Sequence, residues 1–413
     1  MKSSRRLFLK SSGLAVFGIT SGIIPSWMQS AVKATNLMNP DKKKILICIF
    51  QRGAMDGLMA VSPYRDEYFK SSRPGLYIEP SASLGSIELD DRWSLHPGLS
   101  LFHSIFQQKD LAIVHGIGLP NNTRSHFDAQ DYMESGTPYT KNTSTGWLGR
   151  ASSLIPDAEN HFKSISLTSN LPKSLYGDPH AVAISDLHDF KLISDQNNHT
   201  RNGFESLYSS ASQSLMNETG QESFEALKII QASANKRYSP ENNARYPSSQ
   251  LGNSLRQIAQ LIKMKIGLEI AFAESIGWDT HFNQGSVNGI FARNAKDFSE
   301  SIAALWADLG DLQDHVTILT MTEFGRTVKQ NGTGGTDHGR GSCNFIIGKN
   351  ILGGKVYHQI ESLSPEVLED GRDLPVTIDY RSVLNEVVTK QLNINNKEIL
   401  FPGWNGRETG IMK

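Results

Sequence analysis

The stretch Val316-Thr-Ile-Leu-Thr-Met321, followed directly by Thr322-Glu-Phe-Gly-Arg326, decides the fold class of this chain. A continuous apolar run rich in β-branched residues is typical of a strand buried on both faces of a parallel sheet. Similar runs predict further strands at 45–50, 111–114, 267–276 and 344–347. Apolar residues at helical spacing predict helices at 102–106, 255–262 and 291–309. Strands separated by helices predict an α/β fold with a mostly parallel central sheet and helices on both faces.

The composition argues against several classes of protein. The 413 residues include 41 Lys and Arg against 42 Asp and Glu, a net charge of −1, which argues against a general nucleic-acid binder. With only two cysteines, Cys48 and Cys343, neither a disulfide framework nor a thiolate metal cluster is expected. Both lie in apolar runs, which predicts buried free thiols, although one bridge between them is an alternative. The polar stretch 186–249 predicts a helical insertion within one domain spanning 44–413.

The N-terminus carries an export signal by its pattern. Arg5-Arg-Leu-Phe-Leu-Lys10 closely resembles the twin-arginine signal, and the apolar run 13–28 that follows is short for a membrane span. We expect residues 1–34 to be a signal peptide, cleaved after Ala34. The expected partner is the twin-arginine export machinery, and the expected location is the periplasm or another extracytoplasmic space, without a stable membrane anchor. An uncleaved anchor helix is the alternative.

Two polar motifs follow the first two predicted strands. Asp56 lies just beyond the first strand among glycines, where α/β proteins bind ligands, although an ordinary Asp-Gly turn also explains it. After the second strand, Ser125 and Asp128 suit a helix N-cap with a variant capping box. Capping explains neither Arg124 nor His126. A helix N-terminus also favours an anion or a nucleophile that gains negative charge.

Three more motifs follow later strands. Asp279 and His281 lie two residues apart, so an extended backbone turns both toward one point. Glu323 directly follows the strand at 316–321, and a glycine-rich loop presents the adjacent pair Asp337 and His338. Carboxylate with imidazole is a natural ligand set for a divalent first-row metal. Solvated loops would have to explain all five motifs separately, so we predict a functional site at the strand ends.

These motifs resemble those of the bacterial family catalogued as domain of unknown function 1501, in which a twin-arginine leader is common. The resemblance covers nearly all of the mature chain, from about Lys44 to the Asp379-Tyr-Arg-Ser382 segment. The segments that carry it are Arg-Gly-Ala-Met-Asp-Gly-Leu, Arg-Ser-His-Phe-Asp-Ala-Gln-Asp, Gly-Trp-Asp-Thr-His-Phe-Asn-Gln, Thr-Glu-Phe-Gly-Arg and Gly-Gly-Thr-Asp-His-Gly-Arg-Gly.

That family in turn resembles the alkaline-phosphatase and sulfatase superfamily, which has a paired-metal site at the carboxyl ends of its strands. The resemblance implies Ser125 as the nucleophile, with Thr123 as the alternative, and Arg124 or Arg326 as the group that holds an anionic substrate. It implies one or two divalent cations per chain (zinc, manganese or calcium, with iron also compatible). The predicted ligands are Asp56, His126, Asp279, His281, Glu323, Asp337 and His338.

The sequence departs from the superfamily in three places. Glu323-Phe324 stands where Asp-His is usual, Asp279 and His281 are closer together than the corresponding pair, and no cysteine nucleophile motif is present. Two hypotheses therefore remain. One is an exported metal-dependent hydrolase of phosphate or sulfate esters. The other is a non-catalytic exported protein that keeps the fold and binds a polysaccharide, an anion or another protein.

Overall fold

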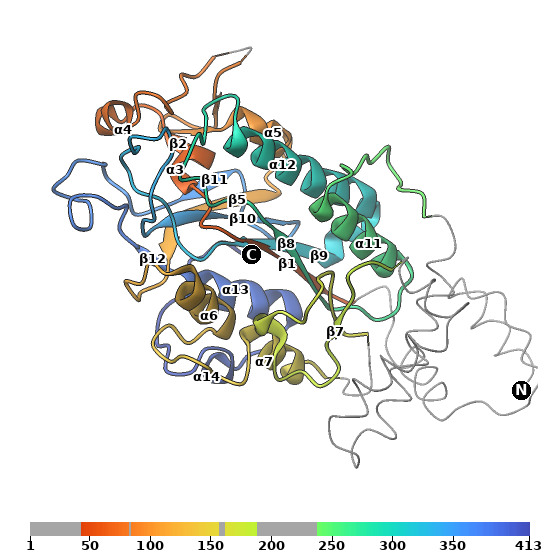
Figure 1. Ribbon diagram of the computed structural model, residues 1–413. Helices are drawn as coiled ribbons and strands as arrows, with labels where there is room; N and C mark the ends of the chain where they lie inside the picture. The colour runs from red at the N-terminus through yellow and green to blue at the C-terminus, as the bar shows by residue number, and fades with distance from the viewer. Residues whose placement is uncertain (1–42, 82–83, 157–161, 188–237) are drawn as a thin grey trace, which may run out of the picture.

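The computed structural model describes residues 43–81, 84–156, 162–187 and 238–413 (Figure 1). The predicted signal peptide at 1–34 lies outside these residues. So does most of the predicted insertion at 186–249, of which only 186–187 and 238–249 are described.

A nine-stranded sheet forms the centre of the domain, in the order β11-β5-β10-β9-β1-β8-β6-β7, with β12 also paired to β5. β1 lies between β8 and β9 and is parallel to both, whereas β10 is antiparallel to its neighbours β5 and β9. The predicted mostly parallel sheet is confirmed. The strands are β1 Ile45–Gln51, β5 Leu111–Gly118, β6 Ser164–Ser166, β7 Val182–Ala183, β8 Ile270–Ser275, β9 Val316–Met321, β10 Ser342–Gly348, β11 Lys355–Tyr357 and β12 Ile378–Asp379.

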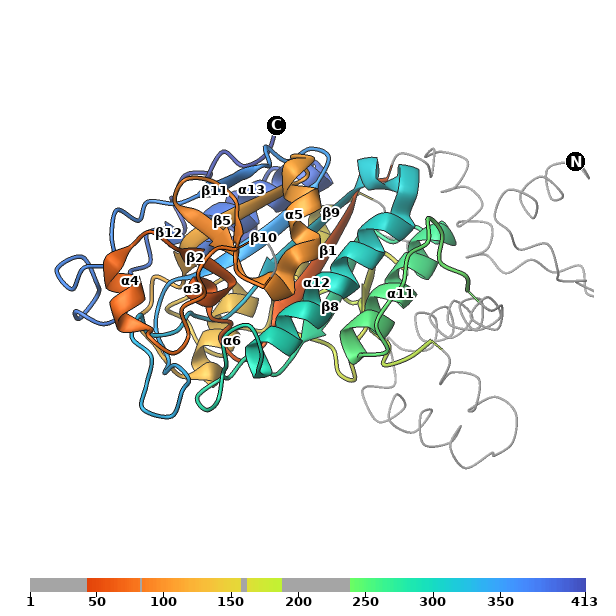
Figure 2. The same ribbon diagram turned by 90° about the horizontal axis from the view of Figure 1, so that it is seen from above.

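Helices cover both faces of the sheet, as predicted (Figure 1). On one face lie α5, α11 and α12, which correspond to the three predicted helices, and α11 packs beside α12 (Figure 2). The other face carries α6, α7, α13 and α14. The bounds are α5 Ser100–Gln107, α6 His126–Ser135, α7 Trp147–Leu154, α11 Gln250–Lys263, α12 Ile290–Leu309, α13 Tyr380–Leu392 and α14 Lys397–Leu400.

The domain also contains smaller elements. A separate three-stranded sheet has the order β2-β4-β3. These elements are α3 Gly57–Ala60, β2 Val61–Pro63, α4 Glu67–Ser72, β3 Ile87–Glu88, β4 Trp93–Leu95 and the 3-10 turns η2 Pro97–Leu99, η3 Lys173–Leu175 and η4 Gly310–His315.

The strand β1 contributes side chains to two hydrophobic cores, one on each face of the sheet. Ile45, Ile47 and Ile49 pack into the core under α5, α11 and α12, whereas the intervening Leu46 and Cys48 pack toward α7 and α13. Successive side chains of a strand point to opposite faces, so a strand covered by helices on both sides must be apolar throughout.

The structure explains two features of the sequence, the two cysteines and the glutamates in the predicted strand at 267–276. Cys48 and Cys343 are fully buried free thiols, as predicted, and burial raises the pKa of each. The glutamates that interrupt the predicted strand at 267–276 are both paired: Glu269 with Lys43, and Glu274 with Arg52. Paired carboxylates at the two ends of β8 explain why the run still forms a strand.

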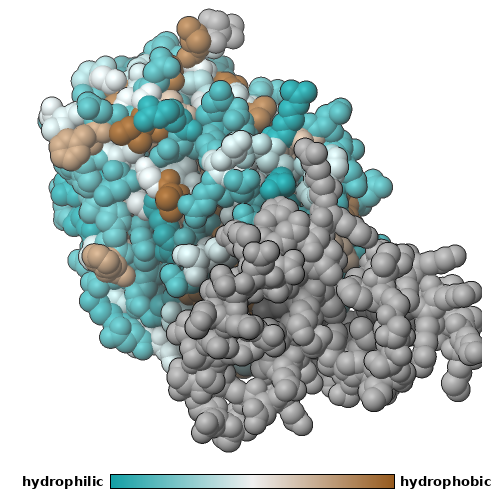
Figure 3. All heavy atoms as spheres, turned by 45° about the vertical axis from the view of Figure 1, so that its right-hand side comes forward, coloured by the Kyte–Doolittle hydropathy of each residue, from teal (hydrophilic) through white to brown (hydrophobic). Residues whose placement is uncertain are grey.

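The surface of the domain is mostly hydrophilic in the view of Figure 3, where hydrophobic side chains stand singly among polar ones. Isolated exposed apolar residues are normal for a globular protein. Across the described residues, no helix combines the length and apolar character that a membrane crossing requires.

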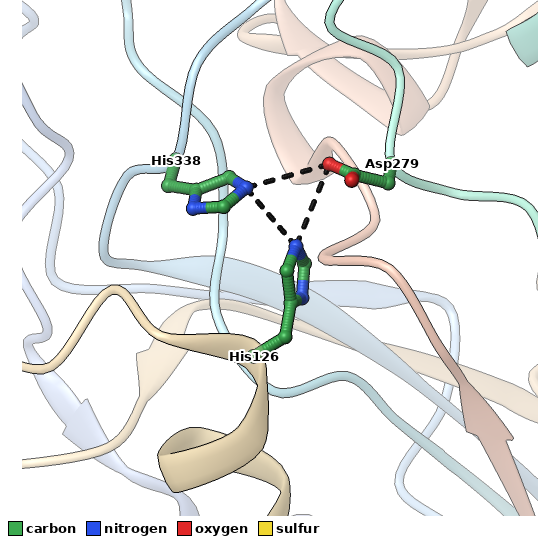
Figure 4. A group of neighbouring side chains, drawn as sticks. All are labelled: His126, Asp279 and His338. Atoms are coloured by element: carbon green, nitrogen blue, oxygen red, sulfur yellow. Dashed lines mark hydrogen bonds and ion pairs between the residues drawn. The ribbon is translucent and has the colours of Figure 1, made fainter.

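The parallel pairing of β1, β8 and β9 determines where the polar motifs meet. Their carboxyl ends lie at one edge of the sheet, so the segments that leave them start close together. These segments carry Asp56, Asp279 and Glu323. The start of α6 and the loop before β10 bring His126 and His338 to the same edge (Figure 4).

Candidate metal centre

Three side chains from separate parts of the chain converge at this edge (Figure 4). His126 is the first residue of α6, Asp279 lies in the loop after β8, and His338 lies in the loop before β10. The two imidazole Nε2 atoms are 3.0 Å apart, and Asp279 Oδ1 lies 3.5 Å from that of His126 and 3.4 Å from that of His338. Tetrahedral ligands bound to zinc at about 2.0–2.1 Å lie about 3.3 Å from one another. The group therefore has the dimensions of a metal site.

A third imidazole borders the group. His281 Nε2 lies 2.9 Å from His338 Nε2 and 3.1 Å from Asp279 Oδ1. Its loop contains Asp279 as well, so the two-residue spacing does direct both side chains to one place, as the sequence predicted. Three imidazoles and one carboxylate thus meet at the end of the sheet.

Each of these imidazoles has its other nitrogen, Nδ1, beside an oxygen that can only accept a hydrogen bond. Nδ1 must then carry the proton, which leaves the lone pair of the neutral ring on Nε2, facing the group. Metal-binding histidines commonly have such an outer oxygen partner. The partners are Glu323 Oε1 at 2.8 Å from His126, the Arg124 carbonyl at 2.8 Å from His338, and Asp337 Oδ1 at 3.2 Å from His281.

Glu323 and Asp337 therefore lie one shell farther out than the sequence analysis placed them. Glu323 is fully buried, and burial alone would raise its pKa. Hydrogen bonds from His126, Gln130 and the Gly53 N–H outweigh burial and hold the pKa of Glu323 below its usual range. The carboxylate stays charged and orients His126.

The neighbours shift the pKa values of the histidines in opposite directions. The hydrogen bond that His126 donates to Glu323 raises the pKa of His126. Burial, followed by the positive charge of Arg326, lowers the pKa of His338. These shifts favour a protonated His126 beside a neutral His338. Without a cation, the Nε2 proton of His126 would point at the Nε2 lone pair of His338, 3.0 Å away. A metal ion would replace that proton.

Arg326 contacts the group from the protein interior, because its side chain is fully buried. This guanidinium is buried, donates to the carbonyl oxygens of Gly53 and Ala54, and contacts Asp279 Oδ1 at 2.5 Å. Burial raises the pKa of Asp279, but Arg326 outweighs it, so the net pKa is lowered. Arg326 thus fixes the carboxylate in place, which leaves it little freedom for the substrate-holding role that the resemblance implied.

The structure does not bring Asp56 into the group. Its carboxylate is fully buried in a two-bonded pair with the equally buried Arg73, at 2.8 and 3.1 Å. Asp56 also caps α3 by accepting the N–H of Met59. These contacts occupy both of its oxygens, so the predicted ligand serves as the partner of an arginine.

Ser125 is the N-cap of α6, and its hydroxyl accepts the N–H of Asp128 at 3.5 Å. The side chain is exposed, and Thr123 Oγ1 in turn accepts the Ser125 N–H at 3.2 Å. This geometry agrees with the role of Ser125 as a helix cap. Ser125 as a nucleophile stays a prediction, and Thr123 remains its alternative.

Arg124, predicted to hold an anion, is paired with two carboxylates. Its guanidinium donates to the buried Asp373 at 2.9 and 2.5 Å and to Asp370 at 3.2 Å. Its side chain is still 30% exposed, and Arg372 beside it is 46% exposed. The Arg372 guanidinium donates to the carbonyl oxygen of His338. Arg124 and Arg372 thus both pair with Asp373, and both guanidinium groups remain partly exposed to solvent.

Sequence reasoning missed the residues that support the group from behind. Gln130 and Gln284 lay inside quoted motifs, but uncharged amides carry no metal-ligand signal. Arg73 lies 17 residues after Asp56 and Asp373 lies 249 residues after Arg124, and no local pattern marked either pair. Only the pairing of distant segments reveals their contacts.

Fold and site define an α/β protein with a candidate metal centre at the carboxyl ends of parallel strands. Residues 112–409 match the family described as "Protein of unknown function (DUF1501)", so the chain belongs to that family, as the motifs indicated. The sequence matches none of the curated proteins.

Solved structures with a similar chain course have low identity. The PsFucS1 sulfatase from Pseudoalteromonas sp. shows 12% identity and a TM-score of 0.40, over 95% of this chain and 78% of that one. Ps i-CgsB shows 9% and 0.39, over 89% and 76%. The lipoteichoic acid synthase LtaP from Listeria monocytogenes shows 9% and 0.31, over 79% and 72%. At these values no activity is carried over to this chain.

Proposed function

We propose that this chain is a metal-dependent hydrolase-like protein that holds one divalent cation between His126, Asp279 and His338, with His281 at its border. One observation carries the proposal. Imidazole Nε2 atoms and a carboxylate oxygen approach within 3.5 Å of one another, while outer oxygens hold the ring protons on the far nitrogens. Lone pairs that face one another repel unless a cation lies between them.

The ligand types favour zinc, with manganese or iron as the next choices. Neutral imidazole suits these metals, whereas calcium takes oxygen ligands almost exclusively. A mixed set of imidazoles and one carboxylate therefore argues against calcium, which the sequence had left open. Catalytic zinc sites have three protein ligands and leave the fourth position of the metal open for water or substrate. Three ligands from His126, Asp279 and His338 would match that arrangement.

A divalent cation at this position would supply Lewis acidity, lowering the pKa of a bound water and polarising an ester oxygen. The protein's own residues prepare that chemistry. Glu323 keeps the proton on His126 Nδ1, and Arg326 holds Asp279 in one orientation. Because these partners are buried, the geometry is formed before a substrate arrives.

For the substrate, we propose a phosphate or sulfate ester, on a small molecule or a polysaccharide. Arg124 and Arg372 support this choice, because both are partly exposed cations linked to His338 through the backbone.

We also propose that the protein acts after twin-arginine export, in the periplasm or another extracytoplasmic space. The support is the paired Arg5 and Arg6 in the leader sequence. Replacing both with lysine should leave the precursor inside the cell, because the paired guanidinium groups are the expected recognition feature. Cell fractionation measures this, and normal export of the double variant would contradict the assignment.

The proposed function is tested by metal analysis combined with an ester screen. The purified protein should contain about one equivalent of zinc, manganese or iron per chain. It should also hydrolyse at least one aryl phosphate or aryl sulfate, with a rate that falls by orders of magnitude in His338→Ala. Metal without hydrolysis of any ester would favour the non-catalytic binding protein, which the capping role of Ser125 supports. No bound metal would refute the proposal.

A further inference from the structure

A buried ion pair lies where a second cation would be expected. Asp56 follows β1, the position that the resemblance implies for a metal ligand. The structure pairs it with Arg73, which follows α4, and both side chains are fully buried. A two-pronged guanidinium–carboxylate pair is among the strongest hydrogen-bonded arrangements in proteins.

Every polar atom of this pair has a partner. Oδ1 of Asp56 accepts from the Met59 N–H and from one nitrogen of Arg73, and Oδ2 accepts from the other nitrogen and from Gln284 Nε2 at 2.8 Å. Arg73 also donates to the carbonyl oxygens of Val328 and Thr327, both at 2.8 Å. A metal on Asp56 would have to leave a buried guanidinium without its counter-charge, which is strongly unfavourable.

We propose that Arg73 permanently supplies the positive charge that a second metal ion would otherwise bring. The centre then holds one cation, and Asp56 is a positioning residue and not a ligand. The statement about metal number rests on the proposed function. The statement that Arg73 neutralises Asp56 does not, because it concerns a contact that exists without metal.

The same buried network reaches the loops of the metal centre. Gln284, which donates to Asp56, uses its own Oε1 to accept the hydroxyls of Thr280 at 2.8 Å and Thr336 at 2.7 Å. Thr280 directly precedes His281, and Thr336 lies two residues before His338. Asp56 therefore orients Gln284, and Gln284 holds the two histidine loops together.

Zinc titration of the metal-free protein, followed by competition with a chelating dye, tests the metal number. Wild type should bind one equivalent. Asp56→Asn, which keeps the shape of the side chain, should still bind one equivalent with an affinity within about tenfold of wild type, because its effect passes through positioning. The matched variant Asp279→Asn should lose tight binding. Two equivalents in wild type, one of which is lost in Asp56→Asn, would overturn the proposal, while the equivalent that depends on Asp279 would still support the site at His126, Asp279 and His338.

Thermal unfolding without metal tests the ion pair separately. Asp56→Asn should lower the melting temperature by about 5 °C or more, because it leaves Arg73 buried without a counter-charge. The double variant Asp56→Asn with Arg73→Met should recover part of that loss. The recovery keeps the test informative if the single variant folds poorly. A double variant less stable than Asp56→Asn would refute the counter-charge role, and a wild type that binds no zinc would refute the proposed function alone.

Discussion

Two carboxylates follow neighbouring parallel strands, yet their surroundings are opposite. Asp279, after β8, has a half-exposed side chain, which faces three imidazole Nε2 atoms and is also paired with the buried Arg326. Asp56, after β1, is fully buried and faces a guanidinium. One site is open and short of positive charge, and the other is closed and neutral. The role of a carboxylate at a strand end thus depends on which distant side chain reaches it.

The comparison also separates how the two regions gain stability. Asp56 and Arg73 neutralise each other's charge in the folded protein, so this pair requires no ion from solution. Among the described residues, the cationic side chain in contact with the group around Asp279 is Arg326, which donates to the carboxylate and to backbone carbonyl oxygens. We therefore expect the first region to respond to mutation in stability, and the second to respond in metal affinity.

The largest effect is expected from removing an imidazole of the open group. His338→Ala should weaken zinc binding by more than about 100-fold, beyond the 10–100-fold typical for an outer partner. Competition with a chelating dye measures the affinity. His103→Ala, at a half-buried histidine on α5, serves as the control and should bind like wild type. Equal affinity in the two variants would remove His338 from the site.

Metal removal should affect stability by the next largest amount. A ligand that binds only the folded state adds about 2.7 kcal/mol when its free concentration is 100 times Kd. Wild type with zinc should therefore melt at a higher temperature than the chelated protein. Asp279→Asn should show no such difference, whereas Asp56→Asn should retain it. A difference lost in both variants would erase the distinction between the two carboxylates.

Glu323→Gln should have an intermediate effect, a 10–100-fold loss of zinc affinity. The charged carboxylate holds His126 in the orientation that presents Nε2, and an amide does this less well. The metal-free variant should also show a lower pKa for His126, because the Glu323 hydrogen bond is what raises it. Proton NMR titration of the ring protons measures the pKa. An unchanged pKa would mean that Glu323 does not orient this ring.

The smallest effect is expected at Ser125, next to the open group. If Ser125 only caps α6, then Ser125→Ala should lower the free energy of unfolding by about 1 kcal/mol and leave ester hydrolysis unchanged. Urea unfolding and a rate measurement on the same sample distinguish the roles. Loss of hydrolysis by orders of magnitude at nearly constant stability would restore Ser125 as the nucleophile.

The strands were predictable because their burial leaves a local signature. The runs at 45–50, 111–114, 316–321 and 344–347 are continuous in apolar residues, and each lies within a strand of the sheet. The helix α13 was not predicted, because polar residues break its apolar pattern. Its buried Glu386 accepts the N–H groups of Gly410 and Met412, and Gln391 accepts from Thr317. Only distant partners make those polar positions tolerable.

The site was predictable in its residue types but not in their order around the centre. Histidines and carboxylates after strands indicated a metal site, and the structure brings His126, Asp279, His281 and His338 together. It places Glu323 behind His126, and Asp56 beside Arg73. A sequence motif carries the chemistry of a side chain, but its direction depends on backbone paths that other segments set.

By itself, the sequence determined the α/β class, the parallel strands, the buried thiols and the set of side chains gathered at one edge. These follow from local patterns, since hydrophobic periodicity acts over a few neighbouring residues. The tertiary structure alone decided which carboxylate met an imidazole and which met Arg73. Glu323 and His126 lie 197 residues apart and Asp56 and Arg73 lie 17 apart, so no local pattern sets either pair, and in the buried interior an ionised group is stable only beside a partner of opposite charge.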